Sequence, residues 1–168
     1  MHRLAELTTA LLNDAEGTRR RLSVPGLVWE PVEGQDAEEW ERTSEARVGE
    51  PPAVGGPLVA LVKKEPGRKN AFLMGITVGR VATNDVVVAH TSVSRFHAFL
   101  QHDEALGAWT VADAESKNGT WLEGRRLAAR ERVLLSDGVS LRFGEVRFYF
   151  LLPDSLLELV RRGEPPRR

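Results

Sequence analysis

The chain has no cysteine among its 168 residues, which excludes disulfide bonds and thiol chemistry. Its formal net charge is −1 at pH 7, so no overall attraction to nucleic acid or to an acidic membrane surface is expected. No apolar run approaches the length of a membrane span. The first residues are interrupted by Glu6, Asn13 and Asp14, so they lack the apolar segment of a secretion signal. We therefore expect a small cytoplasmic protein with one core of ordinary size.

Residues 1–22 predict an amphipathic helix. Leucines recur in it near helical spacing, at Leu4, Leu7, Leu11 and Leu22. A short helix of this kind needs a surface that covers its apolar face. Two alternatives follow: the helix packs on the rest of the protein or on a second copy, or it binds a dedicated partner protein.

Residues 23–57 are rich in proline, glycine and acidic side chains, and this composition predicts a linker. Two tryptophans, Trp29 and Trp40, are unusual in such a segment. They either dock on the globular part or belong to a short recognition segment.

From residue 58 to residue 152 the chain consists of short apolar runs separated by turn residues. The runs are 58–62, 71–74, 76–78, 86–88, 96–100, 109–111, 120–122, 133–135, 140–143 and 146–150. Many short strands with such turns predict an all-β fold, a two-sheet antiparallel β-sandwich. Residues 153–168 predict a closing helix and tail, with Asp154 as the N-cap and Gly163 as the stop.

Three polar motifs lie within this β-rich region. Gly79–Arg80 ends a strand-like run, residues 93–98 read VSRFHA, and residues 116–120 read SKNGT. An arginine guanidinium gives the strongest charge-assisted hydrogen bonds to a phosphate, a serine supplies a short hydroxyl donor, and Asn-Gly forms a tight turn. Together these groups could hold a phosphate and the peptide that carries it.

The order and spacing of these motifs resemble the forkhead-associated (FHA) family, over about residues 58–152. With its short extensions the chain resembles small bacterial signalling adaptors that contain a single FHA domain. The resemblance implies an FHA-type sandwich whose loops at one end bind phosphothreonine-containing segments of proteins marked by a Ser/Thr kinase. It implies no cofactor, no metal and no catalytic residue.

The resemblance also assigns roles to individual residues. Arg80 is implied to be the main phosphate ligand, and the other residues implied to contact the phosphate or the peptide are Ser94, Arg95, Lys117 and Asn118. A role in orienting the loops is implied for Gly79, Asn84, Asp85, His97, Gly119 and Thr120. Glu123 departs from the family pattern, which usually has Asn before the following glycine.

Two other functions remain open from the sequence. In the first, the sandwich or its helices form a phosphate-independent scaffold for partner proteins. In the second, Ser94 and His97 act as a nucleophile and its base. The sequence supplies no recognisable orienting acid for such a pair, and no strand–serine–helix elbow.

Thr43 is a candidate phosphorylation site, and Thr8, Thr9 or Thr18 could serve instead. It lies in the acidic stretch 41–45, which a kinase could enter. The linker that follows is long enough for a phosphorylated Thr43 to reach the loops of its own domain.

Overall fold

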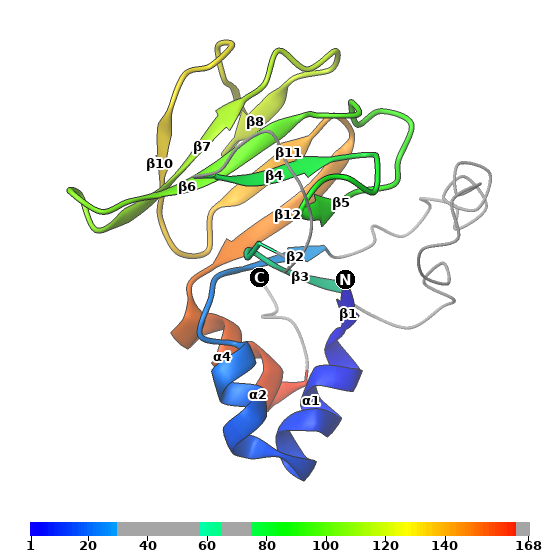
Figure 1. Ribbon diagram of the computed structural model, residues 1–168, viewed down its shortest axis with the longest axis vertical. Helices are drawn as coiled ribbons and strands as arrows, with labels where there is room; N and C mark the ends of the chain where they lie inside the picture. Colours follow the sequence, from blue (N-terminus) through cyan, green and yellow to red (C-terminus); the bar gives the residue numbers. More distant parts are fainter. Residues whose placement is uncertain (30–57, 65–74, 164–168) are drawn as a thin grey trace.

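The computed structural model describes residues 1–29, 58–64 and 75–163. Within these residues two β-sheets form a sandwich, and three helices lie together beneath one end of it (Figure 1). The elements in chain order are β1 (His2–Arg3), α1 (Leu4–Asn13), α2 (Ala15–Arg21), β2 (Gly26–Trp29), β3 (Leu58–Leu61), β4 (Ile76–Gly79), β5 (Val86–Val87), β6 (Ala98–Asp103), β7 (Ala108–Asp113), β8 (Thr120–Leu122), β9 (Arg125–Arg126), β10 (Val133–Leu135), β11 (Ser140–Phe143), β12 (Val146–Leu151) and α4 (Pro153–Arg162). Within the described ranges, no helix has both the length and the apolar character needed to cross a membrane.

One sheet has the strand order β1-β3-β2-β12-β11-β8-β9, and the other has the order β10-β7-β6-β4-β5. The strand pairs are antiparallel apart from β4 and β5, which run parallel. The two-sheet, largely antiparallel sandwich predicted from the sequence is therefore confirmed.

The main core lies between the two sheets and contains three fully buried phenylalanines: Phe143, Phe148 and Phe150. They occupy alternate positions of β11 and β12, because successive side chains of a strand point to opposite faces. Burial of each phenylalanine stabilises the fold by about 1.5–3 kcal/mol. This alternation leaves the intervening residues of the same strands on the outer face.

Strand β2 corrects the sequence-based assignment of residues 23–57 to a linker. Gly26–Trp29 pairs with β12 on one side and β3 on the other, and Trp29 is buried in the main core. All four residues of the strand are buried, because the second sheet covers one face and the helices cover the other. Residues 71–74, Trp40 and Thr43 lie outside the described residues.

The predicted N-terminal helix is two helices, since Asp14 interrupts it and accepts a hydrogen bond from the Gly17 backbone at 2.9 Å. Together with α4 these helices cover the outer face of β2 and β3. The nine residues of this second core are Leu4, Leu7, Leu22, Val28, Val59, Leu61, Leu156, Leu159 and Val160. The Thr8 hydroxyl donates to the Val160 carbonyl at 2.9 Å and links α1 to α4. Of the two alternatives for the N-terminal segment, the structure shows packing on the protein itself.

Helix α4 is present as predicted and ends at Gly163, whose φ of 70° is the left-handed conformation that glycine accepts most readily. Its N-cap is Leu152, however, and Asp154 lies in the first turn behind Pro153. Proline suits this first helical position because its missing N–H would have no partner there.

Candidate functional site

Three loops meet around an open depression of about 720 Å³. They follow β4, precede β6 and join β7 to β8, strands that lie away from the helices (Figure 1). The lining residues are Arg80, Thr91, Ser92, Val93, Ser94, Arg95, Phe96, Ala114, Glu115, Lys117 and Asn118. The structure thus brings together all five residues that the sequence analysis implied as phosphopeptide ligands.

Three cationic side chains surround this depression: Arg80, Arg95 and Lys117. All three residues are exposed, and none forms an ion pair with another residue of the described ranges. The acidic residue on the lining, Glu115, is paired with Arg130 at 3.0 Å. The depression therefore presents uncompensated positive charge, which favours an anionic ligand.

Ser94 joins two of the loops. Its Oγ accepts a hydrogen bond from the Lys117 backbone N–H at 3.0 Å, and its own N–H donates to Nδ1 of His97 at 2.9 Å. Because the hydroxyl acts as the acceptor in the first contact, its proton remains available for donation to a ligand.

His97 is fully buried beneath the loops. Since Nδ1 accepts from Ser94, the proton of the neutral ring lies on Nε2, which donates to the Gly119 carbonyl at 3.1 Å. Burial lowers the pKa of His97 and keeps the ring neutral, although its bond to Gly119 and the charge of Asp113 oppose this shift. Both ring nitrogens are bonded to backbone groups, so the structure holds no Ser94–His97 nucleophile–base pair.

Gly79, Asn84 and Asp85 shape the loop that carries Arg80. The Asn84 side-chain amide donates to the carbonyls of Val81 at 2.8 Å and Arg95 at 2.7 Å. A Cβ on Gly79 would lie 2.3 Å from the Arg95 carbonyl oxygen, so this position has no room for a side chain. Asp85 accepts from the backbone and hydroxyl of Thr77 at 2.8 and 2.9 Å, which anchors the far end of the loop.

The loop that carries Lys117 and Asn118 is built on Asp113. One carboxylate oxygen accepts from the hydroxyls of Ser116 at 2.6 Å and Thr120 at 2.7 Å, and the other accepts from the Ser116 N–H at 2.9 Å. Burial raises the pKa of Asp113, but these hydrogen bonds outweigh it and leave the pKa below its ordinary value. The ionised carboxylate therefore fixes the loop.

Asn118 and its turn complete the rim. The Asn118 side-chain amide donates to the Ser92 carbonyl at 2.8 Å, which leaves the side-chain oxygen as an acceptor for a ligand. Gly119 has a φ of 82°, a left-handed conformation that suits the predicted Asn-Gly turn.

Two residues that support the site were missed in the sequence analysis. Ser92 is buried, and its hydroxyl accepts from the Glu145 N–H at 2.9 Å, so it joins the β11–β12 turn to the rim. Ser116 accepts from the Gly119 N–H at 2.9 Å while bonding Asp113. A serine three residues after an aspartate is a recognisable local signal for such a turn, whereas the contact between Ser92 and Glu145 spans 53 residues and has no local signal.

Within the described residues, cations without an ion-pair partner and a serine hydroxyl converge on loops at one end of a β-sandwich, an arrangement that favours an anionic ligand. Residues 76–144 match the family model of the FHA domain, which includes every predicted ligand residue. The chain therefore contains an FHA domain.

Individual proteins are similar to parts of the chain. The chain is 36% identical to the ABC transporter ATP-binding/permease protein Rv1747 of Mycobacterium tuberculosis, over 52% of this chain and 11% of the relative. It is 31% identical to the FHA domain-containing protein PS1 of Arabidopsis thaliana, over 45% of this chain and 5% of the relative. The chain thus spans a small fraction of the length of these curated relatives. Among solved structures, the FHA domain of the CT664 protein from Chlamydia trachomatis matches with a TM-score of 0.50 and 18% identity, covering 76% of this chain and 96% of that chain.

Proposed function

We propose that this protein binds phosphothreonine-containing segments of partner proteins, and so recruits partners that a Ser/Thr kinase has phosphorylated. The observation that carries the proposal is the group of three cations around the depression that have no ion-pair partner among the described residues, with the Ser94 hydroxyl between two of its loops. A phosphate monoester carries a charge of about −1.5 to −2 at neutral pH and has three strong acceptor oxygens.

Each lining residue has a role in this proposal. Arg80 binds two phosphate oxygens through its planar guanidinium, and Ser94 donates its hydroxyl to the phosphate. Lys117 and Arg95 add charge at the phosphate or the peptide. The free side-chain oxygen of Asn118 accepts a backbone N–H of the bound peptide. Threonine is preferred over serine because burial of its methyl group contributes about 1 kcal/mol.

Isothermal titration calorimetry tests the proposal with a peptide selected from a phosphothreonine library, its phosphoserine twin and its unphosphorylated twin. We expect measurable binding of the phosphothreonine form, weaker binding of the phosphoserine form and none of the unphosphorylated form. Equal binding of all three would instead support the phosphate-independent scaffold.

The Arg80→Ala variant tests the site itself. Loss of the charge-assisted contacts should cost about 1.5–3 kcal/mol of binding, which is roughly a 10- to 150-fold loss of affinity. The matched control is Arg19→Ala, which removes the same charge from helix α2. An unchanged affinity of Arg80→Ala would place the phosphate elsewhere.

Three further points belong to this proposal. The role requires binding and no catalysis. A cytoplasmic location is included, because the protein must meet its partner where the kinase acts. Phosphorylation of Thr43, which lies outside the described residues, is proposed as a way to fill the site from within the chain, and its test is loss of peptide binding after stoichiometric modification.

A further inference from the structure

The outer face of the seven-stranded sheet carries four residues in register across four adjacent strands. Arg147 of β12 pairs with Arg142 of β11, Arg142 pairs with Trp121 of β8, and Trp121 pairs with Arg126 of β9. Directly paired residues of neighbouring strands place their side chains on the same face of a sheet. We call Arg126, Trp121, Arg142 and Arg147 the arginine row.

Burial and contacts confirm that the arginine row faces outward. Phe148 beside Arg147 and Thr120 beside Trp121 are fully buried, so the alternation of each strand directs their neighbours away from the core. The guanidinium carbon of Arg142 lies 4.1 Å from the centre of the Trp121 ring, a cation–π contact that sets both side chains on one surface. Arg126 and Arg147 are exposed.

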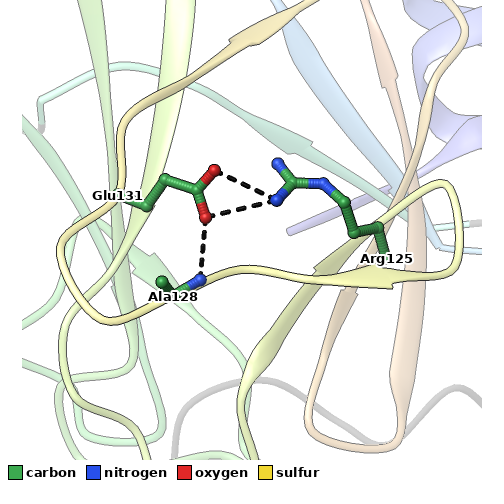
Figure 2. Close-up of polar contacts among 3 residues, drawn as sticks. All are labelled: Arg125, Ala128 and Glu131. Atoms are coloured by element: carbon green, nitrogen blue, oxygen red, sulfur yellow. Dashed lines mark hydrogen bonds and ion pairs between the residues drawn. The ribbon is translucent and has the colours of Figure 1, made fainter.

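The charge of the arginine row is not neutralised by the described part of the protein. Figure 2 shows the contrasting case of Arg125, which is bonded to Glu131 at 3.0 Å, while Glu131 also accepts the Ala128 N–H. No described acid forms an ion pair with Arg126, Arg142 or Arg147. Like charges directly opposite each other destabilise a sheet, so the pairing of Arg142 with Arg147 is unfavourable unless an anion lies beside it.

The arginine row begins at the rim of the depression. A Cβ on Gly119 would lie 2.5 Å from Nε of Arg126, so this guanidinium lies directly against the Asn118–Gly119 turn. The indole nitrogen of Trp121 lies 3.5 Å from the Asn118 carbonyl oxygen. Strands are about 4.8 Å apart, so the four positions span about 14 Å, which is the length of about four extended residues.

We propose that the arginine row binds acidic residues on one side of the phosphothreonine in the partner segment. This inference rests on the proposed function. The depression binds the phosphate, and the bound peptide then passes Asn118 and lies along the arginine row. The acidic side chains pair with Arg126, Arg142 and Arg147, and the peptide backbone runs along the row. The partner is therefore a protein segment with a phosphothreonine followed or preceded, within about five residues, by a cluster of Glu or Asp.

A discrete acidic peptide fits this surface better than a nucleic acid does. Glu123 and Glu145 are exposed in the turns that join β8 to β9 and β11 to β12, next to the strands of the arginine row. They would repel a continuous phosphate backbone, whereas separate carboxylates can be spaced between them. The formal net charge of −1 also gives no general attraction to nucleic acid.

The experiment compares three phosphothreonine peptides built on the library-selected sequence. One has four alanines on each side of the modified residue, one has four glutamates after it, and one has four glutamates before it. We expect one acidic peptide to bind at least about fivefold more tightly than the alanine peptide, with the difference reduced by added salt. In the double variant Arg126→Glu/Arg147→Glu this gain should disappear, so that the acidic peptide binds no more tightly than the alanine peptide to the same variant.

The control is Arg19→Glu with a thermal melt of each variant, since Arg19 is an exposed arginine of α2 at the helical end (Figure 1). Arg19→Glu should keep the gain. The inference is overturned if neither acidic peptide binds more tightly, or if the gain survives in the double variant. It is also overturned if a single-stranded oligonucleotide binds the row more tightly than the acidic peptide. The unphosphorylated acidic peptide could bind as tightly as its phosphorylated form and lose that binding in the double variant. This result would support binding of acidic residues by the arginine row and would refute the proposed phosphate site.

Discussion

Replacement of His97 by alanine tests whether the buried imidazole supports the binding loops. The change removes the acceptor for the Ser94 N–H and one of the two donors to the Gly119 carbonyl, which also accepts from the Gly144 N–H at 3.1 Å. An unsatisfied buried N–H costs about 1–3 kcal/mol. The lost ring also leaves a void beside Phe143, whose ring centre lies 5.8 Å away, and this adds about 1–2 kcal/mol.

We therefore expect the free energy of unfolding to fall by about 3 kcal/mol, which corresponds to a Tm lower by roughly 10 °C for a chain of this size. Chemical denaturation and thermal melts measure this change. Ser94→Ala is the matched control, because its half-buried hydroxyl accepts one hydrogen bond and its loss should change Tm little while weakening phosphopeptide binding. An unaltered Tm in His97→Ala beside a destabilised Ser94→Ala would reverse the two roles.

The same residue predicts a pH dependence. Burial depresses the pKa of His97 below its ordinary value of 6.5, so between that value and the lower folded-state pKa the unfolded chain binds more protons than the folded one. His97 should therefore contribute nothing to the pH dependence of stability above about pH 6.5, and the free energy of unfolding should decline as the pH falls below that value. The corresponding part of the decline should be missing in His97→Ala, and an identical slope in both proteins between pH 6.5 and 5 would refute the reasoning.

Further predictions concern the supports of the loops and helices. Gly79→Ala should destabilise the protein by about 1–3 kcal/mol, because its Cβ would lie 2.3 Å from the Arg95 carbonyl oxygen and 2.7 Å from the Asn84 amide; an unchanged Tm in a thermal melt would contradict this. Asp113→Ala should cost at least about 2 kcal/mol, because it leaves the Ser116 N–H and two hydroxyls without their acceptor; an unchanged urea midpoint would contradict this. Thr8→Val should cost about 1 kcal/mol by removing the bond to Val160, as measured by urea denaturation, and phosphopeptide affinity should stay the same since the helices lie away from the loops (Figure 1).

The sandwich and its ligand residues could be predicted because their signals are local. Short apolar runs with turn residues between them predict strands wherever they lie in the chain. Arg80 after Gly79, Ser94 before Arg95, and Asn118 before Gly119 were each recognisable within a few residues. The family resemblance then placed them in one site, and the structure brings them to one depression.

Glu123 departs from the FHA family pattern, which usually has Asn before the following glycine, and the structure explains how the turn accommodates it. It has a φ of 48° in a turn with Gly124, a conformation that Asn or Gly adopts more easily. Its side chain accepts a hydrogen bond from the Ser140 N–H, which offsets part of that cost. The glutamate is therefore compatible with the turn, and the loops that form the depression are unaffected.

The tertiary structure decided what depends on contacts between distant parts of the chain. Gly26–Trp29 has no alternation of apolar and polar residues, because the second sheet buries one of its faces and helices α1 and α4 bury the other. The four residues themselves carry no signal that predicts packing against either the sheet or the helices. The arginine row depends on strand register in the same way, since a shift of one residue would turn each arginine to the opposite face. The sequence by itself therefore determined which residues could bind a phosphate, and the packing of the two sheets decided which charges lie beside them.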